Sequence, residues 1–432
     1  MNRLDLFPIS TTIEKDTLSI AGHTLTKLTE EYGTPLYVYD KATMDAAAMG
    51  YKNALASHYP GPDSVTYAGK AFLCTAIAQW TQLHGLYVDC TGEGEIAIAM
   101  AGGVPREHIL VHGVNKSTAD LKSAIQHAEI IVVDNLTELK KIQSLITNYQ
   151  SPTYNIWLRL LPGVSVNTHH VHTQTGQHDS KFGMTREEIL EAAEFCKQHN
   201  LPLNGIHFHQ GSNFRDASPL KAAIEIGLDI VKEVGLAGEW HFSPGGGWGV
   251  AYHEDELPQP DTNEYVRIIA ESVIEGCKTR GLTLPHLHLE PGRSLVARAG
   301  VAIYKVGAIK RRGDKIWILT DGGMTDNPRH AMYGARYSCL PVSGVSGERS
   351  EIVSIAGPYC ESGDVVIEGL PMPNIQEGDL IAIPASGAYQ LSMSSNYNGA
   401  RKPAVLWLEN GAVRVIQKRE TIASLLQRDE MI

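Results

Sequence analysis

Eight short apolar runs alternate with amphipathic stretches between roughly residues 60 and 290 of this 432-residue chain. The runs have the length of buried strands, and the stretches between them repeat apolar residues every three or four positions, which is the period of a helix. The eight runs are VTYA (65–68), LYVD (86–89), ILVH (109–112), IIVV (130–133), NIWLRL (155–160), GIHFH (205–209), WHFSPG (240–245) and HLHLE (286–290). Because parallel neighbours need a crossover connection, this alternation predicts a parallel sheet.

Eight strand–helix units over roughly 230 residues predict a (β/α)8 barrel of the TIM type, whose usual size is about 250 residues. An open, doubly wound sheet is the alternative that the same alternation permits.

The chain changes character after residue 300. Segments rich in β-formers follow one another there, separated by Gly, Pro and Asp turns, and they predict a second, all-β domain. The first 30 residues predict an arm poor in helix, with a possible strand at 17–25, that packs on the β domain. We therefore expect the α/β class, with a barrel over residues 35–285 and a β domain formed by residues 1–34 and 286–432.

Composition limits the partners and the compartment. The net charge of −11 argues against a nucleic-acid partner, because such proteins carry basic surfaces. No apolar run is long enough to span a bilayer, and the N-terminal segment lacks the apolar core of a signal peptide. The six cysteines are scattered and form no C-x-x-C pair, so we expect a reduced, cytoplasmic protein without a membrane association.

Polar residues follow the predicted strands at the end where a barrel carries its chemistry. They are Lys70, Asp89, His112, Arg159, His209, Gly245–Gly247 and Glu290. Any one of them could be an ordinary polar residue of a loop. Together they favour a functional site.

Two loops predict an anion site. SPGGGWG follows the seventh run and brings Gly245, Gly246 and Gly247, whose backbone N–H groups can approach an anion closely. EPGR follows the eighth and adds Gly292 and Arg293. Glu290 beside a phosphate makes sense only if the ligand also carries a cation. A phosphate, a pyridinium and a lysine amine are the requirements of pyridoxal 5′-phosphate (PLP).

Two groups of histidines have less specific interpretations. His209 can stack on a planar cofactor or can be a hydrogen-bonded barrel residue, whereas His207 points the same way one layer deeper and is expected to be structural. The HHVH segment at 169–172 lacks the helical spacing of a metal site and has no cysteine or carboxylate partner nearby. We therefore expect a polar loop there and no metal.

Nine segments, in order along the chain, resemble the PLP-dependent decarboxylases of the alanine-racemase fold type, and among these the diaminopimelate decarboxylase family most closely. They are GTPLYVYD (33–40), YAGKA (67–71), GQHDSKFGM (176–184), HFHQGSN (207–213), GGGWG (245–249), EPGR (290–293), TDGGMTDNPRHAMYGARY (320–337), GPYCESGD (357–364) and GAYQLSMSSNYN (387–398). The resemblance implies PLP as the cofactor. It also implies a homodimer with shared active sites, and decarboxylation of meso-2,6-diaminopimelate to L-lysine and CO2.

The resemblance also implies residue roles. Lys70 would hold PLP covalently, His209 would stack on its ring, and Glu290 would keep the ring nitrogen protonated. The phosphate would be bound by Ser212, Gly245, Gly246, Gly247, Gly292, Arg293 and Tyr389. Arg293, Arg329, Tyr333, Tyr389 and Glu361 would bind the substrate. Cys360 would return a proton to the substrate carbon, and it would come with Glu361 from the neighbouring subunit.

The chain departs from the family pattern at Gln210, in RLLPG (159–163) and in TGEGE (91–95). None of these changes removes a group with a named role, but they bear on the shape of the substrate pocket. The same chemistry on ornithine, arginine, carboxynorspermidine or a carrier-bound glutamate therefore stays open. A racemase is disfavoured because Glu290 stands where alanine racemase has an arginine. A PLP-binding protein without turnover is disfavoured by the intact CESGD motif.

Overall fold

The computed structural model describes residues 2–146, 154–164 and 180–432. The chain divides into two compact units. The barrel unit contains Ala48–Gly249 and Asp261–Arg293, and the β unit contains Met1–Ala47, Val250–Pro260 and Ser294–Ile432. No helix in these described stretches is long and apolar enough to cross a membrane.

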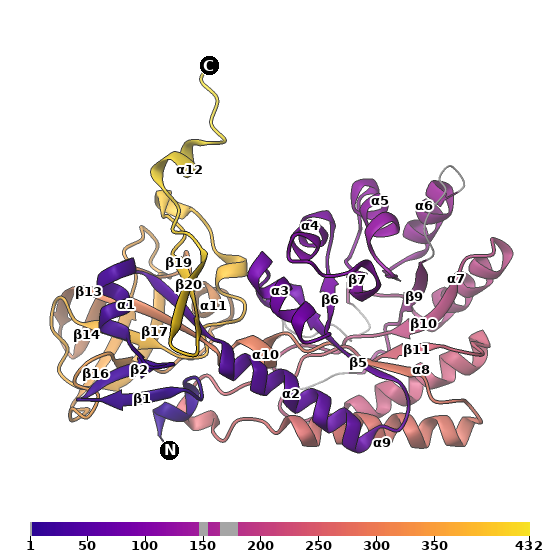
Figure 1. The fold of residues 1–432 in the computed structure, drawn as a ribbon, viewed down its shortest axis with the longest axis horizontal. Helices are drawn as coiled ribbons and strands as arrows, with labels where there is room; N and C mark the ends of the chain where they lie inside the picture. The colour runs from indigo at the N-terminus through magenta and orange to yellow at the C-terminus, as the bar shows by residue number, and fades with distance from the viewer. Residues whose placement is uncertain (1, 147–153, 165–179) are drawn as a thin grey trace. The chain divides into compact units, whose positions relative to one another are not determined.

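Eight parallel strands close the barrel (Figure 1). They are β5 (Asp63–Ala68), β6 (Tyr87–Cys90), β7 (Ile109–His112), β8 (Ile130–Val133), β9 (Asn155–Arg159), β10 (Leu203–His207), β11 (His241–Ser243) and β12 (His286–Leu289). Each of the eight overlaps one of the apolar runs of the sequence. The last strand, β12, pairs with the first, β5, so the sheet is closed and the open doubly wound alternative is excluded.

Helices follow the strands and surround them in Figure 1. They are α3 (Thr75–Leu83), α4 (Glu93–Ala101), α5 (Thr118–His127), α6 (Leu136–Ile146), α7 (Arg186–Gln198), α8 (Leu220–Val234) and α9 (Thr262–Arg280). Ser117 and Thr185 begin α5 and α7 with capping boxes, in which hydroxyl and carboxylate satisfy two backbone N–H groups. Gly235 ends α8 in the left-handed conformation that glycine favours.

The inside of the barrel is unusually polar. His207 on β10 approaches His112 on β7, and His288 on β12 approaches Trp157 on β9, although neither pair lies on neighbouring strands. Such contacts are made across the interior. Barrel interiors are normally filled by branched apolar side chains. Histidines in this position therefore indicate a role other than packing.

The β unit contains one large sheet and one small sheet. Strands of the large sheet run in the order β17 (Val365–Met372), β16 (Glu351–Ala356), β14 (Lys315–Thr320), β13 (Gly300–Arg312), β4 (Leu36–Asp40), β19 (Ala404–Glu409) and β20 (Ala412–Gln417). Off this path, β18 (Leu380–Ile383) pairs with β13 and with β15 (Leu340–Pro341). The small sheet contains β1 (Thr11–Glu14), β2 (Thr17–Ile20) and β3 (His23–Thr24). Leu18, Ile20 and Leu25 share a core with Val301 and Leu406, so the N-terminal arm belongs to this unit.

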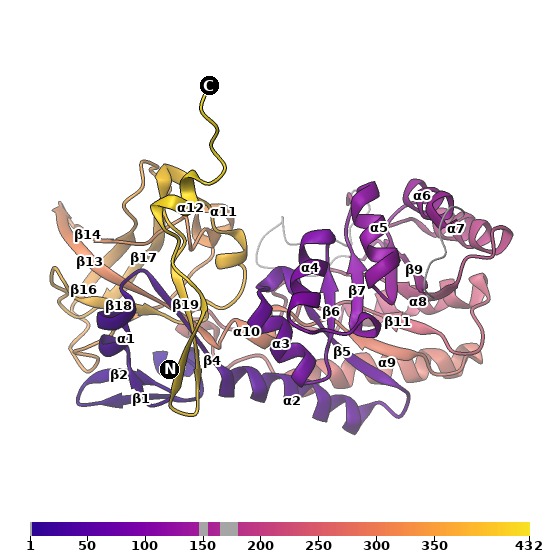
Figure 2. The ribbon, with the colours of Figure 1, turned by 45° about the horizontal axis from the view of Figure 1, so that its top comes forward.

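Five other α-helices are present among the described residues. They are α1 (Leu25–Tyr32), α2 (Lys41–His58), α10 (Arg293–Val296) and α11 (Arg329–Tyr333), and a short α12 (Ile422–Leu426) precedes the C-terminus. Short 3-10 helices are Arg3–Leu6, Gly69–Ala71, Arg106–His108, Glu254–Glu256, Leu391–Met393 and Tyr397–Gly399. In Figure 2 the residues after α12 extend away from β19 and β20 of the same unit.

The structural division differs from the predicted boundaries at three places. Residues 36–40 form β4, which pairs with β13 and β19 of the β unit rather than with a barrel strand. Residues 286–289 form β12, which closes the barrel, so that unit continues beyond residue 285. Val250–Pro260 belongs to the β unit although the residues on both sides belong to the barrel unit. The N-terminal arm also contains a helix, α1, where little helix was expected.

Candidate active site

Lys70 lies directly beyond β5, in the short helix Gly69–Ala71, and is half-buried. A Cβ on Gly69 would lie 2.8 Å from the Asp89 backbone oxygen, so the turn that presents Lys70 needs a glycine to pass β6. Burial raises the pKa of the Asp89 carboxyl, and the Lys70 ammonium opposes that rise. The same ammonium helps to lower the pKa of Glu290. Lys70 is therefore close to two acids from other strands.

Glu290 is a fixed anion at the end of β12. Its Oε1 accepts a hydrogen bond from the Ser243 hydroxyl at 2.6 Å, and its Oε2 lies 3.0 Å from His207 Nε2. Burial alone would raise the pKa of this carboxyl, but His207, Ser243 and Lys70 together lower it. Glu290 is thus ionised at neutral pH, and each carboxylate oxygen still has a lone pair for a further donor.

His207 and His112 are neutral in this arrangement. Burial lowers the pKa of both imidazoles, and the Arg159 guanidinium adds to the effect. A neutral His207 can donate its Nε2 proton to Glu290, which is the tautomer that an ionised acceptor favours. The two rings lie 4.3 Å apart, and His112 Nδ1 is 3.6 Å from Asp89 Oδ2. His207, which the sequence predicted to be structural, is thus a direct partner of the Glu290 carboxylate.

Glycines allow three loops of the barrel to meet. A Cβ on Gly246 would lie 1.9 Å from the Glu290 backbone oxygen, and one on Gly247 would lie 2.0 Å from the Gly211 oxygen. Gly245 and Gly247 also have φ values of 76° and 102°, which favour glycine. The result is a backbone surface without side chains beside Glu290, as a bound phosphate group requires.

His209, Ser212 and Arg293 lie around these loops. The Gly246 N–H donates to His209 Nδ1 at 3.3 Å, and burial followed by the charge of Lys70 lowers the His209 pKa. The Arg293 guanidinium donates to the Ser212 hydroxyl at 2.9 Å. A Cβ on Gly292 would lie 3.0 Å from the Ala68 Cβ, so the EPGR loop packs on the end of β5 next to Lys70.

Arg159 is held by a different partner. Its guanidinium lies 3.3 Å from Asp134 Oδ1 and 4.5 Å above the centre of the Phe182 ring. Asp134 also accepts the Gly183 N–H at 3.0 Å. Asp134 and Phe182 therefore fix the position of the Arg159 charge, and that charge helps to keep His112 and His207 neutral.

The donor set of the barrel end fits PLP. It offers a lysine amine, an ionised carboxylate with capacity for one more donor, a neutral imidazole, a hydroxyl and a guanidinium. Both carboxyl oxygens of Asp89 are buried without a hydrogen-bond partner among the described residues. Buried polar atoms are normally paired, so this end of the barrel is complete only with a bound group or water.

The β unit contains the other predicted residues. Arg329 is 3% exposed, donates to the Tyr337 hydroxyl at 2.6 Å and lies 4.3 Å above the Tyr252 ring. Burial would lower its pKa, but the phenol groups of Tyr252, Tyr337 and Tyr389 raise it, so the guanidinium stays charged. Tyr333 ends the same helix, α11, and is half-buried.

Cys360 and Glu361 lie on an exposed loop between β16 and β17. The Asp364 carboxylate holds the loop by accepting the N–H groups of Tyr359 and Met324 at 2.8 and 2.7 Å. The Cys360 N–H donates to the Asn398 side chain at 2.9 Å. The thiol is thus presented by a braced loop and is exposed in the single chain.

The predicted residues are grouped by unit. Lys70, His209, Ser212, Gly245–Gly247, Glu290, Gly292 and Arg293 belong to the barrel unit, and Arg329, Tyr333, Cys360, Glu361 and Tyr389 belong to the β unit. Sequence reasoning missed Ser243 as a partner of Glu290, although it stands at the end of the seventh run. Tyr252 gave no signal, because it acts on Arg329, which is far away in the sequence. Asn398 stands in the segment GAYQLSMSSNYN (387–398), but its contact with Cys360 was not predicted. The HHVH segment at 169–172 lies outside the described residues.

The fold and the barrel site together define a class: a PLP-binding (β/α)8 barrel joined to a β unit. The family described as "Pyridoxal-dependent decarboxylase, pyridoxal binding domain" matches residues 44–297. The chain belongs to this family of PLP-dependent decarboxylases, and specifically to the diaminopimelate decarboxylases within it.

Three relatives illustrate the similarity. The diaminopimelate decarboxylase of Bacillus subtilis is 38% identical, over 95% of this chain and 95% of its own. That of Actinosynnema pretiosum is 36% identical, over 98% and 95%. The crystal structure of the diaminopimelate decarboxylase from M. jannaschii, in co-complex with L-lysine, has a TM-score of 0.90 and 30% identity, and covers 98% of both chains.

Proposed function

We propose that this protein is a carboxy-lyase that uses PLP to convert meso-2,6-diaminopimelate to L-lysine and CO2. The observation that carries the proposal is the placement of Lys70 at the barrel end that holds the ionised Glu290, whose pKa the Lys70 charge helps to lower. The relatives named diaminopimelate decarboxylase, which cover nearly the whole chain, support the substrate.

The barrel residues have distinct tasks. PLP, when bound, supplies the electron sink that accepts the electron pair left when CO2 departs. Lys70 would hold the cofactor through its amine, and Glu290 would keep a proton on the ring nitrogen because it is ionised. His209 would stack on the ring. Ser212, Gly245–Gly247, Gly292 and Arg293, with Tyr389 of the β unit, would bind the phosphate.

The remaining residues would select the substrate and move a proton. Arg329 and Tyr333, together with Arg293 and Tyr389, would bind the distal carboxylate, since a planar guanidinium matches it. The tyrosines around Arg329 raise the pKa of its guanidinium and so preserve its charge. The carboxylate of Glu361 suits the distal ammonium, and the Cys360 thiol would donate the proton that replaces CO2.

We propose a homodimer in which the partner subunit's Cys360 and the partner subunit's Glu361 complete each site. Both residues are exposed in a single chain, as residues that serve a neighbouring copy must be. Mixing Lys70→Ala with Cys360→Ala subunits is expected to restore part of the activity that each variant lacks. No recovery after verified subunit exchange would contradict the shared site.

We propose a cytoplasmic location, where thiols stay reduced. All six cysteines are free in the structure, and five of them are buried.

A substrate panel tests the function. The PLP-loaded enzyme is incubated with meso-diaminopimelate, ornithine, arginine, lysine, carboxynorspermidine and a carrier-bound glutamate, and both CO2 and the amine product are measured. We expect L-lysine and CO2 from diaminopimelate with the highest kcat/KM. A higher kcat/KM for any other member would overturn the substrate while leaving PLP-dependent decarboxylation in place.

A further inference from the structure

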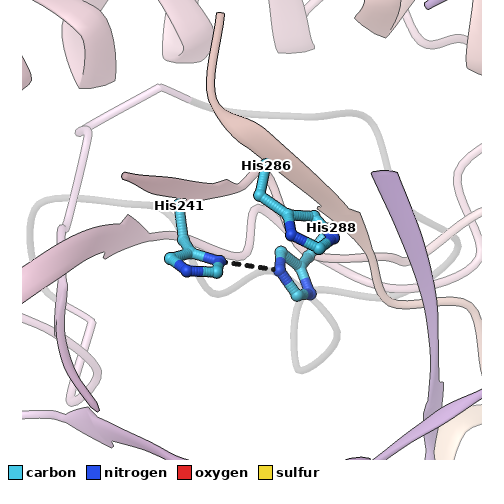
Figure 3. Close-up of side chains that lie close together, drawn as sticks. All are labelled: His241, His286 and His288. Atoms are coloured by element: carbon cyan, nitrogen blue, oxygen red, sulfur yellow. Dashed lines mark hydrogen bonds between the residues drawn. The ribbon is translucent and has the colours of Figure 1, made fainter. Parts of the chain in front are cut away.

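Three histidines converge at the opposite, N-terminal end of the barrel (Figure 3). His241 and His286 are the first residues of β11 and β12 and are register partners in the parallel ladder. His288 follows two positions later on β12 and therefore points to the same face as His286. The topology of two adjacent strands thus brings three imidazoles together.

The three rings are close enough to share one ligand. One ring nitrogen from each residue lies within 4.8 Å of the others. His241 Nδ1 and His288 Nε2 are 3.0 Å apart, which is the dashed line in Figure 3, and the His286 and His288 ring centres are 4.4 Å apart. Three nitrogens around Zn²⁺ at about 2.0–2.1 Å stand roughly 3.4 Å from one another, so movements of about 1 Å would close the set.

The imidazoles are neutral and can offer lone pairs. Burial lowers the pKa of all three, that of His241 to about 4, and neighbouring histidines of the cluster add to the effect at His241 and His288. Asp63 raises the pKa of His286 without overcoming burial. Protons therefore do not compete with a metal ion at neutral pH.

The cluster also contains polar atoms that lack a partner. His288 is fully buried and its Nδ1 has no hydrogen-bond partner among the described residues. The same holds for the indole N–H of Trp157, whose ring lies 4.7 Å from His288 and 5.3 Å from His241. A donor and an acceptor left unpaired in one interior layer indicate a missing occupant.

We propose that His241, His286 and His288 bind one divalent transition-metal ion, with Zn²⁺ as the best match. Three neutral imidazoles form a recurrent zinc ligand set that leaves a fourth position open. The Trp157 N–H is placed to donate to the non-protein ligand there. His241 and His286 are part-exposed, so an ion can enter from the N-terminal mouth of the barrel. Coordination replaces the hydrogen bond between His241 Nδ1 and His288 Nε2 and competes with the one between His286 Nε2 and the Ser64 hydroxyl at 2.8 Å.

This site is separate from the active site. His286 and Glu290 are four residues apart along one extended segment, which corresponds to roughly 13 Å. A second possible set of metal ligands contains His112, His207 and Glu290. It belongs to the active site itself, where bound PLP would keep a metal ion away from it. The test therefore uses the PLP-loaded enzyme.

A binding titration provides the first test. Chelator-treated holoenzyme is titrated with Zn²⁺ in competition with a chromophoric chelator. We expect one tight site per chain and an affinity at least tenfold weaker in His288→Gln and in His241→Gln. His199→Gln, an exposed histidine, and the combined His169→Gln, His170→Gln and His172→Gln variant are matched controls that should keep the site. Loss of binding in the latter control, or none in the first pair, would overturn the proposal.

X-ray absorption on the wild-type protein gives a second test that needs no variant. At one Zn²⁺ per chain we expect about three imidazole nitrogens at about 2.0–2.1 Å and no sulfur ligand. In His286→Gln the imidazole number should fall by one. A spectrum with sulfur, or with at most two imidazoles, would show that zinc does not bind to the three histidines and would overturn the proposal.

Discussion

Both ends of the barrel contain buried histidines, but the histidines are paired with an ionised carboxylate at one end only. Glu290 is ionised at the C-terminal end, with His207 and Ser243 as partners, whereas the N-terminal cluster of His241, His286 and His288 has no carboxylate among its members. His286, His288 and Glu290 follow one another at every second position of one extended segment. Alternation along a strand therefore supplies both clusters, and the residues around them decide their chemistry.

The loops account for the difference. The C-terminal loops bring Lys70, Arg293 and a glycine-lined backbone to Glu290, and these groups suit an anionic cofactor with a cationic ring. The N-terminal cluster has neutral imidazoles and unpaired buried nitrogens instead. We infer that a barrel can carry two sites of different character when its interior is polar through several layers.

Replacement of Lys70 should have the largest effect on activity, and it should affect only the C-terminal end of the barrel. We expect Lys70→Ala to lose the visible absorption band of lysine-bound PLP and to lower kcat by roughly 10³-fold or more, because the amine is removed. Lys278→Ala, at a side chain 77% exposed, is the matched control and should change neither. A Lys70→Ala enzyme with a normal spectrum and rate would refute the assignment of the C-terminal end.

Neutralising the anion should have the next largest effect. Glu290→Gln preserves shape but removes the charge, so we expect kcat to fall by roughly 10²–10³-fold, the usual cost of losing one preorganised electrostatic partner. Glu271→Gln, on the exposed face of α9, serves as the control. Equal kcat values in the two variants would show that the charge of Glu290 is unimportant.

A methyl group in the glycine loop should weaken cofactor binding. Gly246→Ala would place a Cβ 1.9 Å from the Glu290 oxygen, so the loop must move, at about 1–3 kcal/mol of unfolding free energy. We expect a PLP dissociation constant raised by roughly tenfold, which corresponds to about 1.4 kcal/mol. Gly94→Ala in α4, where an added Cβ has no neighbour within 4 Å, should not weaken PLP. Unchanged affinity in Gly246→Ala would remove the loop from the site.

Acid should destabilise the N-terminal end by the smallest amount. The folded pKa of His241 is about 4 against 6.5 for the free group, so the unfolded chain binds more protons between these values. Its contribution to stability is fully present above pH 6.5 and falls as pH drops toward 4. Between pH 7 and pH 5 the loss is roughly 1–2 kcal/mol.

Denaturant titrations with chelator present measure this loss. His241→Gln should show a smaller decline of unfolding free energy between the two pH values, whatever its absolute stability. His199→Gln, at an exposed histidine, should decline as the wild type does. Identical slopes in His241→Gln and the wild type would mean that His241 does not titrate as the structure indicates.

Local patterns in the sequence predicted the barrel well. Each apolar run from 65–68 to 286–290 contributes to a strand. The alternation of strand and helix was predictable because it depends on the hydrophobic periodicity of residues that are close together in the sequence. The boundaries between the units could not be predicted in this way. β4 looks like any buried strand, and only its pairing with β13 and β19 assigns it to the β unit.

The site was predictable where chemistry follows strand ends. Lys70, His209 and Glu290 stand there, and the geometry places them in the same end of the barrel unit. The pairing of His207 with Glu290 was not predicted, because it is made across the interior between β10 and β12. The same limitation hid the cluster of His241, His286 and His288, because His241 stands 45 positions before His286, on the other side of α9.

The lysine to which the cofactor is attached identifies the active-site end of the barrel most directly. The PLP-loaded enzyme is reduced with borohydride, digested, and mapped by peptide mass spectrometry. We expect one pyridoxyl group per chain, carried by Lys70 in the peptide that follows β5. A pyridoxyl group on another lysine, such as the buried Lys116, would contradict the assignment of the C-terminal end of the barrel as the active site.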